Sequence, residues 1–347
     1  MIFRRKPSIA AIAPDQPSAF RAPLGRARRI RTAAIATGIA AAVGLALTTV
    51  SVSGASAATR KAGPLPWSSG VYQPSATLAS LAAFGTWRGA PVHVATVWGG
   101  RATWADIVNP AWVYKTWKGA PQTMALGVPM LPEGVAGVSI GACAAGSYNS
   151  YWKQFGTNIS AYGLGKSIIR LGWEFNGNWY IWKASSPASW AKCWQQIVTS
   201  ARTTAPGLQW DWNVNRGVSS GLSNPTLAYP GDAYVNTVGV DSYDMYPAAT
   251  TSAGWNTQLN GTQGLMYWVN FAKAHGKKFA VPEWGSMNTG GSAGGDDPAY
   301  VNDMLGFFQA HSAALAWESN FQGPSTKGTY GAGTSVPKAS AAYQAGF

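Results

Sequence analysis

Short apolar runs alternate with longer segments of helical period from about residue 66 to the end of the chain. Several runs are almost continuously apolar, which is typical of parallel strands covered on both faces. We predict eight strands, at residues 70–72, 92–98, 123–128, 167–173, 208–214, 237–243, 278–282 and 314–317.

The segments between these runs predict helices. Residues 148–162 and 264–275 carry apolar stripes of helical period, and two more helices are predicted to begin at Ser186-Pro187 and Asp297-Pro298, where a capping residue precedes proline. Eight strand–helix units over about 280 residues predict the α/β class and a single (β/α)8 TIM barrel. The alternative is a doubly wound open sheet, but no G-x-G-x-x-G follows the first predicted strand, so a dinucleotide-binding version has no support.

The first 57 residues have a different pattern. A basic stretch ending in Arg28-Arg29-Ile30-Arg31 precedes an apolar run at 33–52 and the small residues Ala55-Ser56-Ala57. This order predicts an export signal segment (1–57), cleaved near Ala57, that leaves one catalytic domain (58–347). We therefore expect a secreted, extracellular protein. An uncleaved membrane anchor is the alternative, and the choice between the Sec and twin-arginine routes stays open.

Charge and composition narrow the classes of function. The net charge is +13, but +7 of it lies before residue 58, and the remaining Lys and Arg are scattered, so we expect no nucleic-acid partner. Cys143 and Cys193 are the two cysteines, and in an exported chain they predict one disulfide. The histidines are far apart and form no metal-ligand spacing. We expect no metal, no organic cofactor, no membrane contact after signal cleavage, and a monomer.

Two carboxylates stand out in a chain with 13 acidic residues. Glu174 follows the fourth predicted strand and Glu283 the seventh, each among indoles and glycines. Catalytic residues of such barrels lie at the C-terminal ends of strands, and two carboxyl groups at one mouth are what glycoside hydrolysis requires. Apolar Trp173 and Phe175 would raise the pKa of Glu174, as a general acid needs. The alternatives are an ion pair of Glu174 with Arg170 and a loop cap at Glu283.

Other residues are candidates for supporting the two glutamates or binding sugar. Arg170 is expected to point into the barrel on the same strand face as Glu174, and a tyrosine phenol could donate a hydrogen bond to the nucleophile. Asp211, Asp241 and Asp244 are interpreted as supporting or structural. Indoles near strand ends could stack on sugar rings, although each could equally be core packing. The candidates for the phenol are Tyr243 and Tyr246. The indoles are Trp98, Trp179, Trp182, Trp212, Trp284 and Trp317. Three asparagines could bind sugar hydroxyls, namely Asn176, Asn213 and Asn215.

The first of these stretches has a familiar form. The pattern Arg170-x-x-x-Glu174-Phe-Asn-Gly-x-Trp179-x-x-Trp182 resembles the acid/base motif of glycoside hydrolase family 26, the β-mannanase family, and Val-Pro-Glu283-Trp-Gly resembles its nucleophile motif. The resemblance implies a clan A barrel, a retaining endo-acting hydrolase of β-linked polysaccharide, Glu174 as acid/base and Glu283 as nucleophile.

The resemblance further implies a tyrosine that orients the nucleophile, and spacing to Glu283 favours Tyr246 over Tyr243. The family usually has His before the acid/base, where this chain has Trp173, which marks a distant branch. The hypothesis is a secreted retaining endo-β-glycosidase with β-1,4-mannan as first substrate. Hydrolysis of β-1,3/1,4-glucan or β-1,3-xylan, a non-catalytic sugar-binding barrel and a cell-envelope remodelling protein are the alternatives.

Overall fold

The computed structural model describes residues 65–288, 291–323 and 334–347. The predicted export signal (1–57) lies outside the described residues. Among the helices that are described, none has the length and apolar character needed to cross a lipid bilayer.

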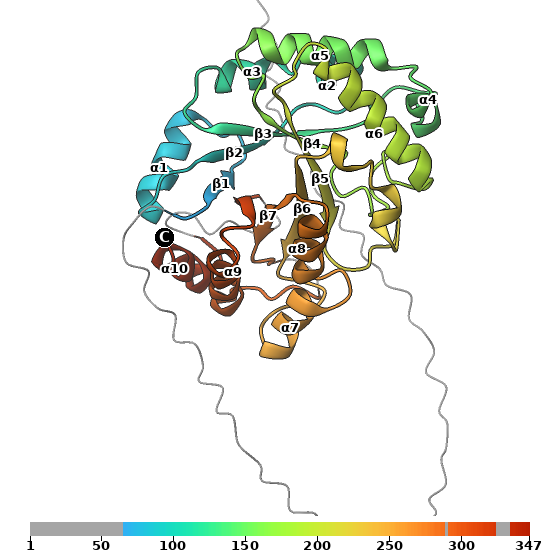
Figure 1. The fold of residues 1–347 in the computed structure, drawn as a ribbon. Helices are drawn as coiled ribbons and strands as arrows, with labels where there is room; N and C mark the ends of the chain where they lie inside the picture. Colours follow the sequence, from blue (N-terminus) through green and yellow to red (C-terminus); the bar gives the residue numbers. More distant parts are fainter. Residues whose placement is uncertain (1–64, 289–290, 324–333) are drawn as a thin grey trace, which may run out of the picture.

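Eight parallel strands form a closed barrel in which each strand pairs with its neighbours in the sequence, and β1 closes on β8 (Figure 1). The predicted (β/α)8 TIM barrel is therefore confirmed. The strands are β1 (Ser68–Tyr72), β2 (Val94–Trp98), β3 (Thr123–Val128), β4 (Ile168–Leu171), β5 (Gln209–Asn215), β6 (Thr237–Tyr243), β7 (Lys278–Gly285) and β8 (Leu315–Phe321).

Helices lie between the strands and surround the barrel, and α9 and α10 pack side by side (Figure 1). The described α-helices are α1 (Leu78–Arg88), α2 (Trp104–Val108), α3 (Ala111–Trp117), α4 (Ile140–Ala144), α5 (Asn149–Ala161), α6 (Pro187–Arg202), α7 (Ser252–Asn260), α8 (Leu265–Ala274), α9 (Pro298–Ala310) and α10 (Pro337–Ala345), with short 3-10 helices η1 (Pro225–Ala228) and η2 (Asp232–Tyr234).

Three strand ends differ from the sequence-based expectation in ways that affect the site. β7 continues to Gly285 instead of residue 282, so Glu283 lies within the strand. β4 ends at Leu171 instead of residue 173, so Glu174 lies in the turn that follows the strand. β8 continues to Phe321 instead of stopping at Trp317. Trp317 therefore lies near the start of its strand, far from the end where catalytic groups gather in such barrels.

The interior of the barrel changes character along its axis. At one level four buried apolar residues pack together, namely Val94, Ala125, Ala280 and Trp317. Towards the C-terminal ends of the strands the inward positions become polar, starting with Thr96, whose hydroxyl donates to Ser319 Oγ over 2.7 Å. The glutamates proposed for catalysis lie on the C-terminal side of this apolar layer.

The predicted disulfide is confirmed. Cys143 of α4 and Cys193 of α6 are both buried and bonded, with their Cα atoms 4.9 Å apart. The bond joins two outer helices through cysteines that are 50 residues apart in the sequence.

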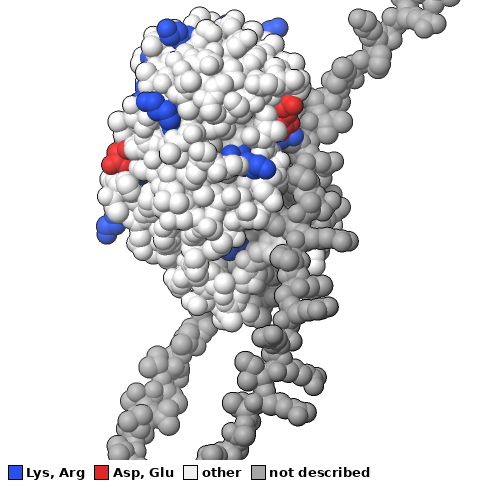
Figure 2. Space-filling model, turned by 90° about the vertical axis from the view of Figure 1, so that its right-hand side faces the viewer, with Lys and Arg blue, Asp and Glu red and all other residues white. Residues whose placement is uncertain are grey.

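The surface of the molecule carries few charged side chains on the face shown in Figure 2, where Lys, Arg, Asp and Glu appear as separate points on an uncharged background. This agrees with the scattered distribution of basic residues after residue 57.

Candidate active site

Glu283 points into the barrel from β7, while its neighbour Trp284 packs outward against the helices. The Glu283 side chain is 1% exposed. Its Oε1 accepts a 2.6 Å hydrogen bond from Arg170 Nη2, and its Oε2 accepts a 2.6 Å hydrogen bond from the Tyr243 hydroxyl. A cation and a phenol donor on opposite oxygens favour the ionised form of a carboxyl group. Glu283 is therefore held as a carboxylate.

Tyr243, the last residue of β6, supplies this phenol. The sequence favoured Tyr246, and that preference was wrong. Tyr246 is three residues farther on and 45% exposed. Burial, followed by the negative charge of Glu283, raises the pKa of Tyr243 well above its ordinary value. The hydroxyl thus stays protonated and remains a donor.

Arg170 enters the barrel from β4 and is fully buried. Its guanidinium contacts Asn213 Oδ1 through Nε (3.1 Å) and Nη2 (2.6 Å), and it pairs with Asp241 Oδ2 at 2.9 Å as well as with Glu283. The Trp98 ring lies 5.3 Å from the guanidinium carbon, within cation–π range. Burial alone would lower the pKa of Arg170, but the carboxylates of Asp241 and Glu283 outweigh this and raise it.

Glu174 follows β4 by three residues and has a left-handed backbone conformation, with φ 53°. Its N–H donates to the Asn213 carbonyl over 2.9 Å, which ties the turn to β5. Asn215 Nδ2 donates to Oε1 over 2.9 Å, and Trp179 Nε1 donates to Oε2 over 3.1 Å. Burial and the negative charge of Glu283 raise the pKa of Glu174 to about 7, against an ordinary value of 4.5.

The two glutamates therefore have opposite environments. Glu283 receives a direct cation, while the ion pairs of Arg170 are with Asp241 and Glu283 and not with Glu174. The alternative of a Glu174–Arg170 ion pair is wrong, because Glu174 leaves the strand and its donors are neutral N–H groups. Repulsion from Glu283 is strong enough to contribute to the pKa of Glu174. Asn213 joins the two, since its carbonyl accepts from the Glu174 N–H and its side chain accepts from Arg170, the partner of Glu283.

A further acid lies deeper in the barrel. Asp211 of β5 is buried and accepts a 2.6 Å hydrogen bond from Thr237 Oγ1. Burial raises the pKa of Asp211 to about 7, although Thr237 and Arg170 oppose the shift. One buried cation, Arg170, thus interacts with four carboxyl groups in this region, and burial raises the pKa of three of them, Glu174, Asp211 and Asp241.

Most of the indoles proposed for sugar binding are core residues instead. Trp179 is half-buried and contacts Glu174, and Trp98 lies beside Arg170. The others are at most 2% exposed, and they are Trp173, Trp182, Trp212, Trp284 and Trp317. Of these, Trp173 donates to the Tyr180 hydroxyl and Trp182 to the Trp173 carbonyl.

The three asparagines are part of the framework. Asn213 accepts from Arg170, and Asn215 donates to Glu174. The Asn176 side chain donates to the Asn215 carbonyl over 2.8 Å and accepts from the Asn215 N–H over 2.9 Å. These amides position the charged groups, a role that a strand-end asparagine in the sequence does not distinguish from sugar binding.

Glu318 is a buried acid whose role the sequence did not indicate. It lies on β8 and accepts hydrogen bonds from Trp284 Nε1 (2.6 Å) and Trp67 Nε1 (3.3 Å) on the outer face of the barrel. Strand alternation gives the one signal in the sequence. Trp317 points into the barrel, so the next residue, Glu318, points outward. In the part of the chain that the structure describes, His, Cys, Asp and Glu form no group of three suited to a metal ion.

Comparison with known proteins agrees with this geometry. The family model for glycosyl hydrolase family 26 matches residues 166–284, a segment that begins just before β4 and includes both Glu174 and Glu283. This region is similar to glycosyl hydrolase family 26. The sequence-based recognition is thereby confirmed. No curated protein matches the chain.

Solved structures of several family 26 enzymes have a similar fold. An endo-β-1,4-mannanase from Cellulomonas fimi, solved as a double mutant, has a TM-score of 0.55 at 17% identity, over 75% of this chain and 64% of that one. GH26C from Muricauda sp. MAR_2010_75 has a TM-score of 0.54 at 16% identity, over 74% of this chain and 78% of that one. The chain thus spans less than two thirds of the length of the C. fimi enzyme, which is described as modular.

Proposed function

We propose that the protein is a secreted retaining endo-β-glycosidase whose first substrate is β-1,4-mannan. The observation that carries the proposal is the contrast between two buried glutamates. Glu283 is ion-paired to Arg170 and hydrogen-bonded by Tyr243, whereas burial and the charge of Glu283 raise the pKa of Glu174 to about 7. A nucleophile must be ionised and a general acid protonated in the same site.

In the first step Glu174 donates its proton to the glycosidic oxygen while a Glu283 oxygen attacks the anomeric carbon. The bond between that carbon and the leaving oxygen breaks, and a glycosyl ester forms on Glu283. Bond formation consumes the negative charge of Glu283. The pKa of Glu174 then falls, because the repulsion that raised it is gone, and this favours proton release.

In the second step the Glu174 carboxylate accepts a proton from water, and the water oxygen attacks the anomeric carbon. The ester bond breaks and Glu283 returns to Arg170 and Tyr243 as a carboxylate. Two displacements at the same carbon retain the anomeric configuration. The residue framework supports both steps, since Asn215 and Trp179 donate to Glu174 from fixed positions.

Several features support the substrate class and the location. The solved structures of similar fold include endo-β-1,4-mannanases, and the matched family model spans both glutamates. The basic stretch, apolar run and small residues before residue 58 favour export. Because Trp173 replaces the usual histidine, β-1,3/1,4-glucan and β-1,3-xylan remain as competing substrates.

A reducing-sugar assay on soluble mannan, mixed-linkage β-glucan and β-1,3-xylan tests the proposal. We expect release from one of these polymers, and a loss of about 10³-fold or more in kcat for Glu174→Gln and for Glu283→Gln. Glu133→Gln is the matched control, because Glu133 forms a surface pair with Arg101. Undiminished turnover in either site variant refutes the assignment. Binding without release by the unmodified chain would instead support a non-catalytic barrel.

A further inference from the structure

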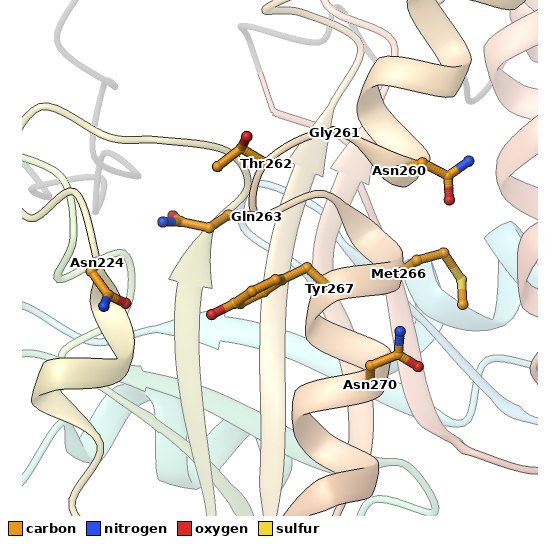
Figure 3. A pocket seen from close by; sticks show the side chains of 8 residues that line it. All are labelled: Asn224, Asn260, Gly261, Thr262, Gln263, Met266, Tyr267 and Asn270. Carbon is orange, nitrogen blue, oxygen red and sulfur yellow. The ribbon is translucent and has the colours of Figure 1, made fainter.

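A pocket of about 650 Å³ lies between η1 and the junction of α7 with α8 (Figure 3). This volume is within the range of small-molecule binding sites. Asn270 lies four residues after Met266 and three after Tyr267, so it is a neighbour of both on the surface of α8. Figure 3 shows Tyr267 in the middle, with amide side chains around it. The described lining residues are Asn224, Asn260, Gly261, Thr262, Gln263, Met266, Tyr267 and Asn270.

The chemistry of this lining is neutral and rich in amides. None of its eight described residues carries a charge at neutral pH, four have carboxamide side chains, and Tyr267 presents an aromatic ring that is 41% exposed. Carboxamides both donate and accept hydrogen bonds, as sugar hydroxyls do, while an aromatic ring offers a flat apolar surface for the C–H face of a sugar. An anionic ligand would find no cation among these residues.

Gln263 supplies an observation that points to a ligand. Its side chain is 7% exposed, and its Nε2 donates to the Ser223 carbonyl, yet Oε1 has no hydrogen-bond partner among the described residues. A buried acceptor without a donor is energetically unfavourable. Gln263 has a left-handed backbone as well, with φ 54°. The Oε1 atom itself is shielded from solvent, so a hydroxyl group entering the pocket would satisfy it once the Gln263 side chain shifts.

The pocket is connected to the active site through one loop. The Gly217 N–H donates to the Gln263 carbonyl over 2.9 Å, and Gly217 follows Asn215, the donor to Glu174, by two residues. The same loop returns to the Asn176 carbonyl through the N–H groups of Gly221 and Leu222. The pocket thus lies beside the catalytic end of the barrel, and its lining residues are separate from the network of the two glutamates.

We propose that this pocket is a second binding site for a neutral polysaccharide chain, outside the site where bonds are cleaved. It holds a stretch of the polymer by stacking on Tyr267 and by hydrogen bonds to Gln263 and Asn270. Binding there needs no hydrolysis, so the proposal goes beyond the proposed activity.

Native gels containing soluble glucomannan, mixed-linkage β-glucan or β-1,3-xylan test the pocket in the Glu283→Gln background, where polymer is not consumed. We expect Tyr267→Ala to raise the dissociation constant obtained from gel retardation about fivefold on at least one polymer. Trp112→Ala is the matched control, because Trp112 is 53% exposed on α3 and lies outside the pocket. Asn270→Ala, at an exposed position, provides a second variant if Tyr267→Ala does not fold.

Activity separates this proposal from the proposed function. In the protein that retains Glu283, the Tyr267→Ala variant should have the same kcat on a short oligosaccharide as the unmodified protein. Its KM on the polymer should be about fivefold higher. Retardation that depends on Tyr267, without release of reducing sugar, supports the pocket and overturns the activity. Equal behaviour of Tyr267→Ala, Asn270→Ala and Trp112→Ala on every gel, or no retardation of any protein, overturns the pocket.

Discussion

At the scale of single residues, the chemistry depends on how donors are distributed between two like acids. Glu283 receives the hydrogen bonds of Arg170 and Tyr243, whereas Glu174 receives those of Asn215 and Trp179. Both side chains are buried, so a local cation or its absence has a large effect on the protonation state. The same residue type consequently performs two roles.

The hydrogen bond from Tyr243 to Glu283 should matter for catalysis. Removing it in Tyr243→Phe is expected to lower kcat by about 10²-fold, because the phenol positions the nucleophile and stabilises its charge as it leaves the intermediate. Tyr246→Phe is the matched control and should leave kcat near that of the unmodified protein. Steady-state kinetics on the hydrolysed polymer measures both. The reverse result, with Tyr246→Phe impaired and Tyr243→Phe active, would restore the sequence-based preference.

At the scale of elements, the sequence predicted the eight strands and the position of both glutamates, because apolar runs mark buried parallel strands. It placed the end of β8 too early, since Glu318, Ser319 and Asn320 interrupt the apolar pattern. These polar residues are buried and form hydrogen bonds to Trp284, to Thr96 and to the Trp284 carbonyl. Such partners come from other strands, and a local pattern does not contain them.

The turn after β4 could not be predicted for a related reason. Gly172 and Glu174 both have left-handed backbones, with φ 55° and 53°. A Cβ on Gly172 would lie 2.6 Å from Met130 Sδ, so Met130 would have to shift to accommodate any other residue there. The turn rotates Glu174 away from Arg170, and the Arg170 guanidinium pairs with Glu283 instead. Alternation along a continued strand had suggested that Arg170 and Glu174 share a face.

The disulfide between α4 and α6 should stabilise the outer layer. A cross-link that closes a loop of 50 residues contributes about 4 kcal/mol in the chain-entropy account. The Cys143→Ser/Cys193→Ser double variant should therefore lose about 2–4 kcal/mol of unfolding free energy in denaturant titrations, while activity at low temperature persists. Reductant should destabilise the unmodified protein by the same amount and leave the double variant unchanged. A double variant as stable as the oxidised parent would contradict this.

At the scale of the whole molecule, charge is concentrated inside the barrel and sparse outside on the face shown in Figure 2. Asp211, Asp241, Glu174 and Glu283 lie around Arg170. Burial raises the pKa of Asp211 to about 7, and burial together with the charge of Glu283 raises the pKa of Glu174 to about 7. The energetic cost of this arrangement depends on pH.

Stability should accordingly fall as pH rises from 5 to 8. Asp211 has an ordinary pKa of 3.8, so it is ionised in the unfolded chain throughout this window, while the folded chain keeps its proton until about pH 7. The contribution lost is about 3 kcal/mol. Asp211→Asn should flatten the profile of unfolding free energy against pH. Asp232→Asn is the control, because hydrogen bonds from Tyr229 and His275 lower the pKa of exposed Asp232, out of this window. Identical slopes in both variants would count against a protonated Asp211.

The protonation states of the two glutamates can be measured directly, since the chain contains four glutamates, Glu133, Glu174, Glu283 and Glu318. Carbon NMR of protein labelled at the Glu carboxyl carbon should give four signals, assigned by single Gln variants. The signal that disappears in Glu174→Gln should titrate near pH 7 in the unmodified protein and at lower pH in Glu283→Gln. Titration of that signal near 4.5, or a midpoint unaffected by Glu283→Gln, would contradict the pairing of a protonated acid with an ionised nucleophile.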